Sequence, residues 1–272
     1  LGLVRFQPSE LMNIIVPMTI AAILSEKTLP PRPLLVAISM VTIGLVVLLI
    51  ARQPDLGTSL LIGASGVYVL FFSGVRVMLL KNKWLNLLLL SSLLGGSLFL
   101  AWNYFLIAYQ KRRILTLFNP ESEPLGSGYH IIQSKIAIGS GGFTGKGIAK
   151  GSQSQLDFVP EQSTDFIFSV LAEELGFLGV LLLIIIYSLI IYRCLILSLR
   201  CEDNFSRLLG ASLTFVFFTY IFVNIGMVSG LLPVVGVPLP LISYGGSSLI
   251  TLMASFGIIM SIHKHKGPRY LQ

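Results

Sequence analysis

The sequence predicts an all-α polytopic membrane protein, a helical bundle with one large extracytoplasmic loop. Of its 272 residues, 54% are hydrophobic and 11% are charged, whereas a soluble domain carries about 25% charged residues. Seven apolar stretches are long enough to cross a bilayer, which takes roughly 20 residues. This composition excludes an ordinary cytosolic enzyme, a disordered chain and a nucleic-acid-binding protein. It predicts a single membrane domain over residues 1–272.

Proline and charge separate the expected spans. The segment Glu26–Pro33 with its three prolines stands between the first and second spans, and Arg52–Asp55 stands between the second and third. A basic stretch joins the third to the fourth, the long polar segment 108–165 follows, and two short loops separate the last three. Such signals end a helix at the membrane surface. The expected spans are residues 10–25, 34–51, 57–73, 85–107, 166–192, 208–229 and 241–262.

Basic residues predict the orientation of these spans. Eleven Lys or Arg fall on one set of alternate segments, against Arg5 and Arg52 in the short segments of the other. Because the positive-inside rule weighs short cytoplasmic segments, the C-terminus is expected in the cytoplasm and the 108–165 loop outside. The eleven residues are Lys27, Arg32, Arg76, Lys81, Lys83, Arg193, Arg200, Arg207, Lys264, Lys266 and Arg269.

The 108–165 loop concentrates ionisable residues. Cations can hold phosphates and a carboxylate can remove a proton, which suits a phosphorylated, membrane-tethered ligand; a solvated loop is the alternative interpretation. Tyr129–Ile138 has apolar residues at helical spacing and predicts a short interfacial helix. The glycine-rich residues 139–151 predict a flexible turn, and their GSGGFTGKG run lacks the pattern of a phosphate-binding loop. The charged residues are Lys111, Arg112, Arg113, Glu121, Glu123, Lys135, Lys146, Lys150, Asp157, Glu161 and Asp165.

Asp165 stands where this loop meets the fifth expected span. One interpretation is a helix N-cap, which stabilises a helix by roughly 1 kcal/mol. The other is a general base, which partial burial beside Phe166 and Phe168 would make more effective. Within the same span, Glu173 and Glu174 should face the bundle interior, because acidic groups are costly inside a membrane. A structural hydrogen-bonding role is favoured for both over a role in a polar cavity.

The remaining polar signals favour structural roles. Cys194 and Cys201 are expected to be free thiols on the reducing cytoplasmic side. The three histidines, including His130, form no evident ligand set, so surface positions are favoured. Residues 228–248 carry three prolines among glycines, and irregular backbone at this depth needs a cavity or other protein beside it. The small residues 245–248 favour close helix packing there.

Five segments together resemble the SEDS family, which includes RodA, FtsW and SpoVE. They follow one another in the family's order. The sequences GKG at 145–147 and QSQL at 153–156 resemble the elongation member, RodA, more than the division member, FtsW. The resemblance implies ten spans, of which this chain carries the last seven, in a bacterial inner membrane. The segments are FQPSE at 6–10, QPDLGT at 53–58, and residues 124–147, 153–176 and 224–248.

The resemblance implies a peptidoglycan glycosyltransferase that polymerises lipid II into β-1,4 glycan strands during cell elongation. The family's essential loop aspartate falls on Asp165, as general base for the acceptor 4-hydroxyl in an inverting displacement. Cations neutralise the pyrophosphate leaving group, and a divalent cation, Mg²⁺ or Mn²⁺, can assist them. The implied partners are an elongation-type class B penicillin-binding protein and inner-membrane lipids. The expected substrate-binding residues are Lys111, Arg112, Arg113, Gln133, Ser134, Lys135, Lys146 and Glu161.

Two departures from the family pattern affect the expected mechanism. Many relatives have His where this chain has Ser163, so a His base is absent there. Many also have Lys where this chain has Asn13, so an ionic role at that position is in doubt. The alternatives are an FtsW-like division polymerase, a lipid II flippase and a scaffold for the penicillin-binding protein. A flippase needs polar groups along a path through the bilayer, whereas the ionisable residues gather outside the spans, which favours the enzyme.

Overall fold

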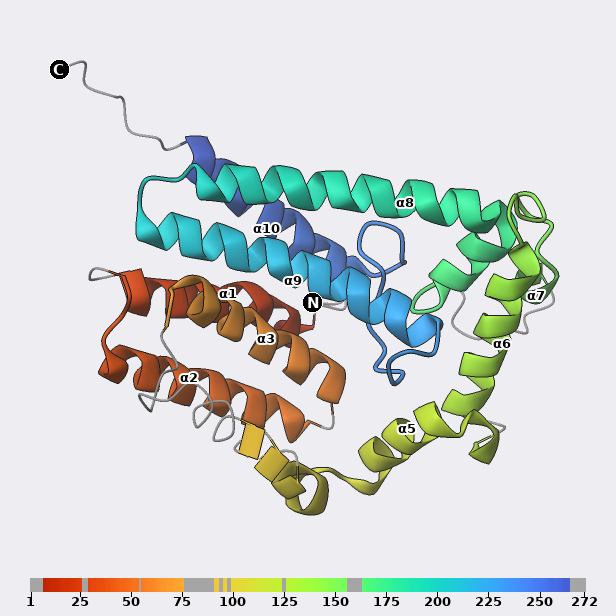
Figure 1. Ribbon diagram of the computed structural model, residues 1–272, viewed down its shortest axis with the longest axis horizontal. Helices are drawn as coiled ribbons and strands as arrows, with labels where there is room; N and C mark the ends of the chain where they lie inside the picture. The colour runs from red at the N-terminus through yellow and green to blue at the C-terminus, as the bar shows by residue number, and fades with distance from the viewer. Residues whose placement is uncertain are drawn as a thin grey trace, which may run out of the picture.

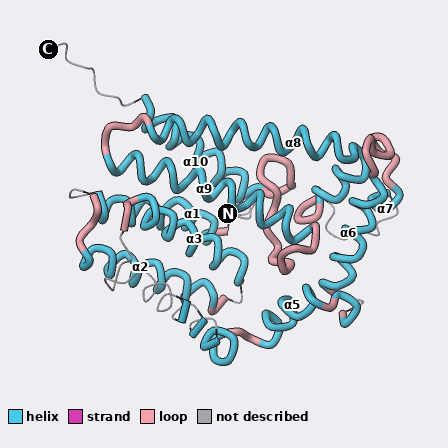
Figure 2. Tube along the Cα trace, viewed as in Figure 1, coloured by secondary structure: helices cyan, strands magenta, loops and turns pink. Residues whose placement is uncertain are grey.

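The structure is a computed structural model that describes residues 7–25, 29–53, 55–75, 91–92, 95–96, 99–123, 126–155 and 163–264, and these contain helices and no strand, as predicted (Figures 1 and 2). The long helices are α1 (Pro8–Ser25), α2 (Pro33–Ala51), α3 (Leu56–Phe72), α8 (Ile167–Leu199), α9 (Asn204–Val228) and α10 (Gly246–Lys264). The shorter elements are a π-helical turn (Ala101–Phe105), α5 (Ala108–Phe118), a 3₁₀ turn (Pro120–Ser122), α6 (Ser127–Gly141) and α7 (Ser152–Gln155).

The six long helices coincide with six of the seven expected spans. Four of them, α1, α2, α8 and α9, are long and apolar enough to cross a membrane, and α3 and α10 provide shorter apolar helices. The fourth expected span, residues 85–107, lies partly outside the described residues, since 85–90, 93–94 and 97–98 are not described. The helix expected at 129–138 is confirmed as α6, which is longer at both ends.

Helix α9 lies at the centre of the bundle. It packs against α8, α3, α1 and α10, and 67% of its most apolar 18-residue stretch is buried. The corresponding stretches of α2 and α8 are each 17% buried, as expected for helices that are apolar all round and face lipid. One buried cluster joins α9 to α1, α2 and α3, and a second joins it to α6, α8 and the segment before α10.

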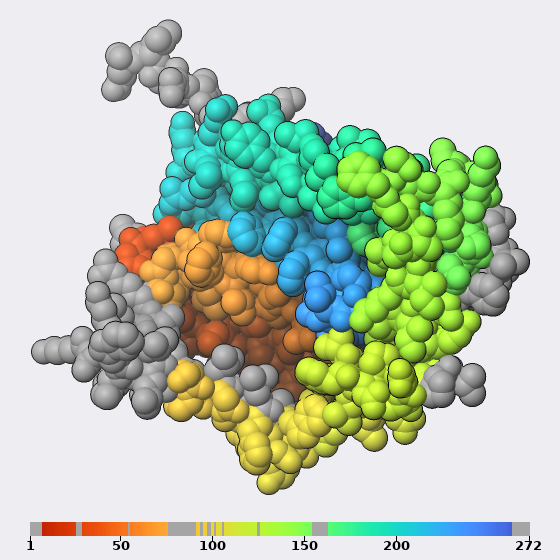
Figure 3. All heavy atoms as spheres, turned by 45° about the vertical axis from the view of Figure 1, so that its right-hand side comes forward, coloured from red at the N-terminus to blue at the C-terminus, as the bar shows by residue number. Residues whose placement is uncertain are grey.

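The loops divide between the two ends of the bundle as predicted. The α1–α2 and α8–α9 connections and the end of α10 lie at the left of Figure 1. The short helices α5, α6 and α7 and the α9–α10 loop lie toward the other end. Figure 3 shows the blue end of α9 and its following loop between orange α3 and yellow-green α5. Which end faces the cytoplasm stays a prediction.

The glycine-rich turn after α6 is fixed to α8, so its predicted flexibility is wrong. The backbone N–H groups of Lys146 and Gly147 donate to the carbonyls of Glu173 and Glu174 at 3.1 and 3.0 Å. Helix α8 is kinked at Gly176, whose φ is +65°. A Cβ added at Gly145 would lie 2.1 Å from the Glu174 carbonyl oxygen, so only glycine permits this close approach.

Candidate active site

A polar cavity of about 330 Å³ surrounds Asp165 at the end of the bundle where the 108–165 elements gather. It is formed by α5, the turn after it, α6, the segment before α8, and the α9–α10 loop. Residues far apart in the sequence therefore line one cavity together with Asp165. The lining residues are Tyr109, Arg112, Arg113, Glu123, Gly126, Ser127, His130, Asp165, Phe166, Val234 and Gly236.

Asp165 lies one residue too early to cap α8. The helix begins at Ile167 and its N-cap is Phe166, which makes no side-chain cap. The N-cap interpretation of Asp165 is therefore wrong. The carboxylate instead lies close to the α9–α10 loop, because a Cβ added at Gly236 would be 3.3 Å from Asp165 Oδ2. Gly236 has a φ of +73°, a conformation that glycine adopts without strain.

Three successive backbone carbonyls hold the segment that carries Asp165. The Ser163 carbonyl accepts from the Tyr244 N–H at 2.9 Å, and the Thr164 carbonyl accepts from Ser243 Oγ at 2.6 Å. The Asp165 carbonyl accepts from Asn224 Nδ2 at 2.8 Å. The segment 228–248, for which helix packing was predicted, thus also positions the candidate base.

Asn224 joins the two walls of the cavity from the end of α9. Its side chain is fully buried, and the same Nδ2 also donates to the Val237 carbonyl at 2.7 Å. Asparagine suits this position because its amide has two N–H donors. Sequence reasoning missed this role. The only available signal was that Asn224 begins the 224–248 segment, and the pairing with Asp165 is a contact across 59 residues.

Replacement of Asn224 by Leu is expected to lower kcat for the polymerisation that the family resemblance implies by about 100-fold, because small displacements of catalytic groups have effects of this size. Loss of the two hydrogen bonds should also lower the free energy of unfolding by about 1–3 kcal/mol. The measurement is kcat and KM for lipid II, with Asn204→Leu at the far end of α9 as the matched control. An unchanged kcat, or a rise in KM alone, would contradict a positioning role.

Two arginines bring positive charge to the cavity. Arg113 Nη1 donates to the Val234 carbonyl at 2.9 Å, its guanidinium carbon lies 4.5 Å from the centre of the Tyr109 ring, and it also donates to the Tyr109 hydroxyl. Arg112 is largely exposed and lies 3.8 Å from the Glu123 carboxylate. Arg113 is therefore oriented by the protein, whereas Arg112 is largely exposed and lies beside Glu123.

Glu123 is the second carboxylate among the described residues of the cavity, and hydrogen bonds from two hydroxyl groups hold it in place. It accepts hydrogen bonds from Ser127 Oγ at 2.8 Å and from Thr116 Oγ1 at 3.1 Å. The Ser127 hydrogen bond, helped by Thr116 and the two arginines, outweighs burial and lowers the pKa of Glu123 below its usual value. A carboxylate held in its charged form in this way is a structural anchor and a poor proton acceptor.

His130 lines the cavity, so the surface position favoured for it is wrong. Its ring stacks on Phe166 with the ring centres 5.6 Å apart and the planes at 22°. Ser127 and His130 both line the cavity from α6 and are three residues apart, the spacing of one helical face. The sequence pattern predicted the helix and did not indicate which of its faces lies toward Asp165.

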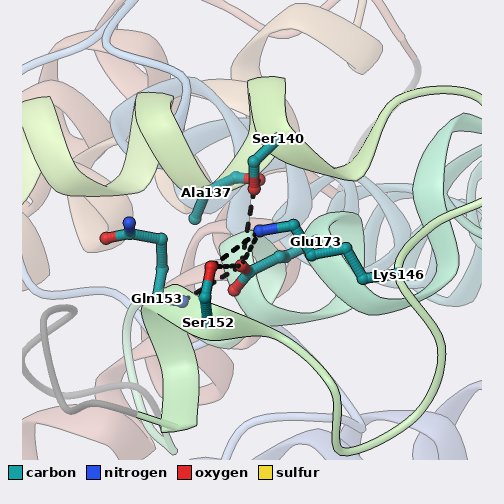
Figure 4. A network of polar contacts seen from close by, with 6 residues as sticks. All are labelled: Ala137, Ser140, Lys146, Ser152, Gln153 and Glu173. Atoms are coloured by element: carbon teal, nitrogen blue, oxygen red, sulfur yellow. Dashed lines mark hydrogen bonds and ion pairs between the residues drawn. The ribbon is translucent and has the colours of Figure 1, made fainter.

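Glu173 is fully buried and accepts several hydrogen bonds (Figure 4). Its Oε1 lies 2.7 Å from Lys146 Nζ and 3.0 Å from the backbone nitrogen of Gln153. Hydroxyl groups of Ser152 and Ser140 donate to the same oxygen at 3.3 and 3.4 Å. The predicted structural role of Glu173 is confirmed, because this network ties α6, the glycine-rich turn and α7 to α8.

Comparison with known proteins identifies the family. A family profile described as a cell cycle protein, FTSW_RODA_SPOVE, matches residues 1–267. The chain belongs to the FtsW/RodA/SpoVE family. The predicted resemblance to SEDS proteins is thereby confirmed, and with it the all-α membrane fold.

Two relatives and one solved structure show which members the chain is similar to. It is 52% identical over 266 residues to the peptidoglycan glycosyltransferase MrdB of Escherichia coli (strain K12), covering 98% of this chain and 70% of that protein. It is 36% identical over 260 residues to the probable peptidoglycan glycosyltransferase FtsW of Trichlorobacter lovleyi, covering 95% and 66%. MrdB is a RodA-type member, so its higher identity to this chain agrees with the predicted elongation type.

The solved structure extends this similarity to the fold. A chain in "Structural coordination of polymerization and crosslinking by a peptidoglycan synthase complex" has a TM-score of 0.75 and 31% sequence identity with this chain. The match covers 97% of this chain and 71% of the other. The fold of this chain is therefore similar to that of a chain in a peptidoglycan synthase complex.

Within this family fold, the predicted substrate-binding residues divide into two groups. Arg112 and Arg113 line the Asp165 cavity, whereas the other described candidates lie elsewhere. Ser134 is fully buried and its hydroxyl donates to the Ile131 and Val228 carbonyls at 3.0 and 2.8 Å, so it has a structural contact. Substrate binding by the others stays a prediction.

The residues outside the cavity have identifiable surroundings. Lys111 Nζ lies 5.9 Å from the centre of the Trp102 ring, and the exposed Lys135 lies over Gly230. Lys146 pairs with Glu173, and Gln133 is partly buried on α6. Glu161 lies outside the described residues.

The predicted divalent cation lacks an obvious protein site. Within the part of the chain that the structure describes, no three His, Cys, Asp or Glu side chains cluster to hold a metal ion. In the cavity, Glu123 is already engaged by two hydroxyls and Arg112. Among the described cavity residues, the donor set therefore does not by itself make a metal site. Assistance by a divalent cation, Mg²⁺ or Mn²⁺, stays a prediction.

Proposed function

We propose that this chain is an elongation-type peptidoglycan glycosyltransferase that polymerises lipid II into β-1,4 glycan strands. The observation that carries the proposal is the Asp165 carboxylate in a cavity with two arginines, at one end of an apolar helical bundle. The names of MrdB and FtsW support the same reaction class. The apolar faces of the bundle suit a substrate whose lipid tail stays in the membrane.

Asp165 acts as the general base. The acceptor 4-hydroxyl oxygen attacks the anomeric carbon of the donor, and its proton passes to the Asp165 carboxylate. The bond from the anomeric carbon to the lipid pyrophosphate breaks, and the pyrophosphate leaves with the electron pair. Arg112 and Arg113 hold this developing negative charge. One displacement inverts the anomeric configuration, so an α-linked donor gives a β linkage.

The proposed setting is the bacterial inner membrane, with the C-terminus in the cytoplasm and the Asp165 cavity outside. The excess of basic residues on the opposite loops supports this orientation. The proposed partner is an elongation-type class B penicillin-binding protein, which cross-links the strands. The similarity to a chain in a peptidoglycan synthase complex that coordinates polymerisation and crosslinking supports such a partner.

A lipid II flippase is the second candidate, and one observation bears on it. Glu10 and Asn13 are buried in α1, where Tyr220 donates to Glu10 at 3.0 Å and Asn13 donates to Tyr220 at 2.8 Å. Polar groups inside a bundle can mark a transport path. The cavity beside them measures about 40 Å³, which holds about one water molecule and not a disaccharide. This favours the polymerase.

The deciding experiment supplies lipid II to the purified protein and its penicillin-binding partner in detergent. We expect glycan strands with release of undecaprenyl pyrophosphate. In a parallel arm, the protein is placed in vesicles that carry fluorescent lipid II in one leaflet. Lipid II that crosses the bilayer while no strands form in detergent would replace the polymerase with a flippase.

A further inference from the structure

A second pocket adjoins the Asp165 cavity. Its volume is about 250 Å³, and it lies between the start of α3, the first turns of α5 and the α9–α10 loop, where Figure 3 shows these elements meeting. Tyr109 and Arg113 line both pockets. These two side chains therefore form the wall between a ligand in the second pocket and a ligand at Asp165.

Gln110 lines this second pocket and carries a buried amide donor. The residue is 3% exposed and belongs to the pocket lining. Its Oε1 accepts from the Ile107 N–H at 3.0 Å, which fixes the orientation of the amide. Its Nε2 has no hydrogen-bond partner among the residues that the structure describes. A buried donor of this kind costs free energy unless a ligand accepts its hydrogen bond.

The other polar groups of the pocket define the chemistry of that ligand. Asp55 accepts from the Thr58 N–H at 3.0 Å and from Thr58 Oγ1 at 2.7 Å, and a carboxylate has lone pairs for further donors. Arg113 contributes one positive charge, so the two charged side chains cancel. Leu56, Ile114, Pro233 and Val235 make the remaining wall apolar. A pocket with no net charge and one apolar wall suits a neutral polar ligand and does not suit a pyrophosphate.

We propose that this pocket is a sugar subsite, which holds an N-acetylated sugar ring next to the ring that reacts at Asp165. The acetamido carbonyl accepts from Gln110 Nε2, and a sugar hydroxyl or the acetamido N–H donates to Asp55. The apolar wall and the Tyr109 ring contact the face of the sugar. This subsite rests on the proposed function, because the lipid-linked substrate of a peptidoglycan polymerase carries two such rings.

The test compares binding of two lipids, lipid II and undecaprenyl pyrophosphate, which shares the tail and pyrophosphate and has no sugar. The variant is Gln110→Glu, which keeps an oxygen for the Ile107 N–H and removes the Nε2 donor. The control is Gln53→Glu, the same change on an exposed side chain. We expect Gln110→Glu to weaken lipid II binding about tenfold, with undecaprenyl pyrophosphate affinity unchanged and the control like wild type.

Two results would overturn the subsite. One is unchanged lipid II affinity in Gln110→Glu, and the other is equal weakening for both lipids in a folded protein. If Gln110→Glu does not fold, Asp55→Asn decides, because asparagine keeps the cap on Thr58 and removes the charge that receives sugar donors. Its expected result is the same selective loss of lipid II affinity.

Binding needs no turnover, so this test is independent of the polymerase test. A wild-type protein that binds lipid II and makes no strands would contradict the proposed function. The comparison of the two lipids would still decide whether Gln110 contacts a sugar.

Discussion

Replacement of Asp165 by Asn is expected to lower kcat for lipid II polymerisation by about 10²–10⁴-fold, the usual contribution of a positioned general base. Asparagine has nearly the same shape and accepts no proton. The backbone carbonyls of residues 163–165 that hold the segment are unchanged, so the fold and lipid II affinity should persist. The measurement is steady-state polymerisation by the purified protein, with its unfolding midpoint recorded on the same sample.

The matched control for Asp165→Asn is Glu121→Gln, which neutralises an exposed carboxylate in the same extramembrane region. We expect this control to polymerise like wild type. Undiminished polymerisation by a folded Asp165→Asn variant would return Asp165 to a structural role and remove the proposed base.

Replacement of Lys146 by Met is expected to lower the free energy of unfolding by about 3–5 kcal/mol, because it leaves a charge unpaired in the interior. Lys146 Nζ lies 2.7 Å from the Glu173 carboxylate, whose side chain is 0% exposed. The lysine itself is 30% exposed, so solvent screening places the loss toward the lower end of this range. Chemical denaturation of the purified protein in detergent provides the measurement.

The second variant of this series isolates the charge. Lys146→Met combined with Glu173→Gln should recover part of the lost stability, because a neutral amide is cheaper to bury than a carboxylate. Lys150→Met, an exposed lysine in the same turn, should change stability little. Equal stability of Lys146→Met and wild type would show that the Glu173 network does not depend on the ion pair.

The apolar bundle was predictable from sequence because its signal is local. Each long helix corresponds to a continuous apolar run, and the helix α6 follows from the spacing of its isoleucines. The sequence placed Asp165 at the junction of the loop and the fifth span, and the family resemblance favoured its catalytic role over the N-cap. Its rejected role as N-cap shows the limit of local reasoning, because moving the start of α8 by one residue gives the cap position to Phe166.

The structure of the site was not predictable because it depends on contacts between distant segments. Asn224 and Ser243 hold the Asp165 segment across 59 and 79 residues. The pairing of Lys146 with Glu173 was not visible in the sequence, which indicated Lys146 only as one of several cations available to a substrate. His130 lines the cavity because one face of α6 is directed toward Asp165, and the sequence does not indicate which face this is. In each case the residue type was visible in the sequence and its neighbour was not.

The stereochemistry of the first strands is the most direct test of the central claim that Asp165 is the base in a single displacement. Strands made by the wild-type protein are treated with a muramidase that cleaves β-1,4 linkages. The mass of the intact protein is measured by mass spectrometry during turnover. The account predicts complete digestion of the strands and no sugar on the protein. A glycosylated Asp165, or strands that resist the muramidase because the α configuration is retained, would contradict it.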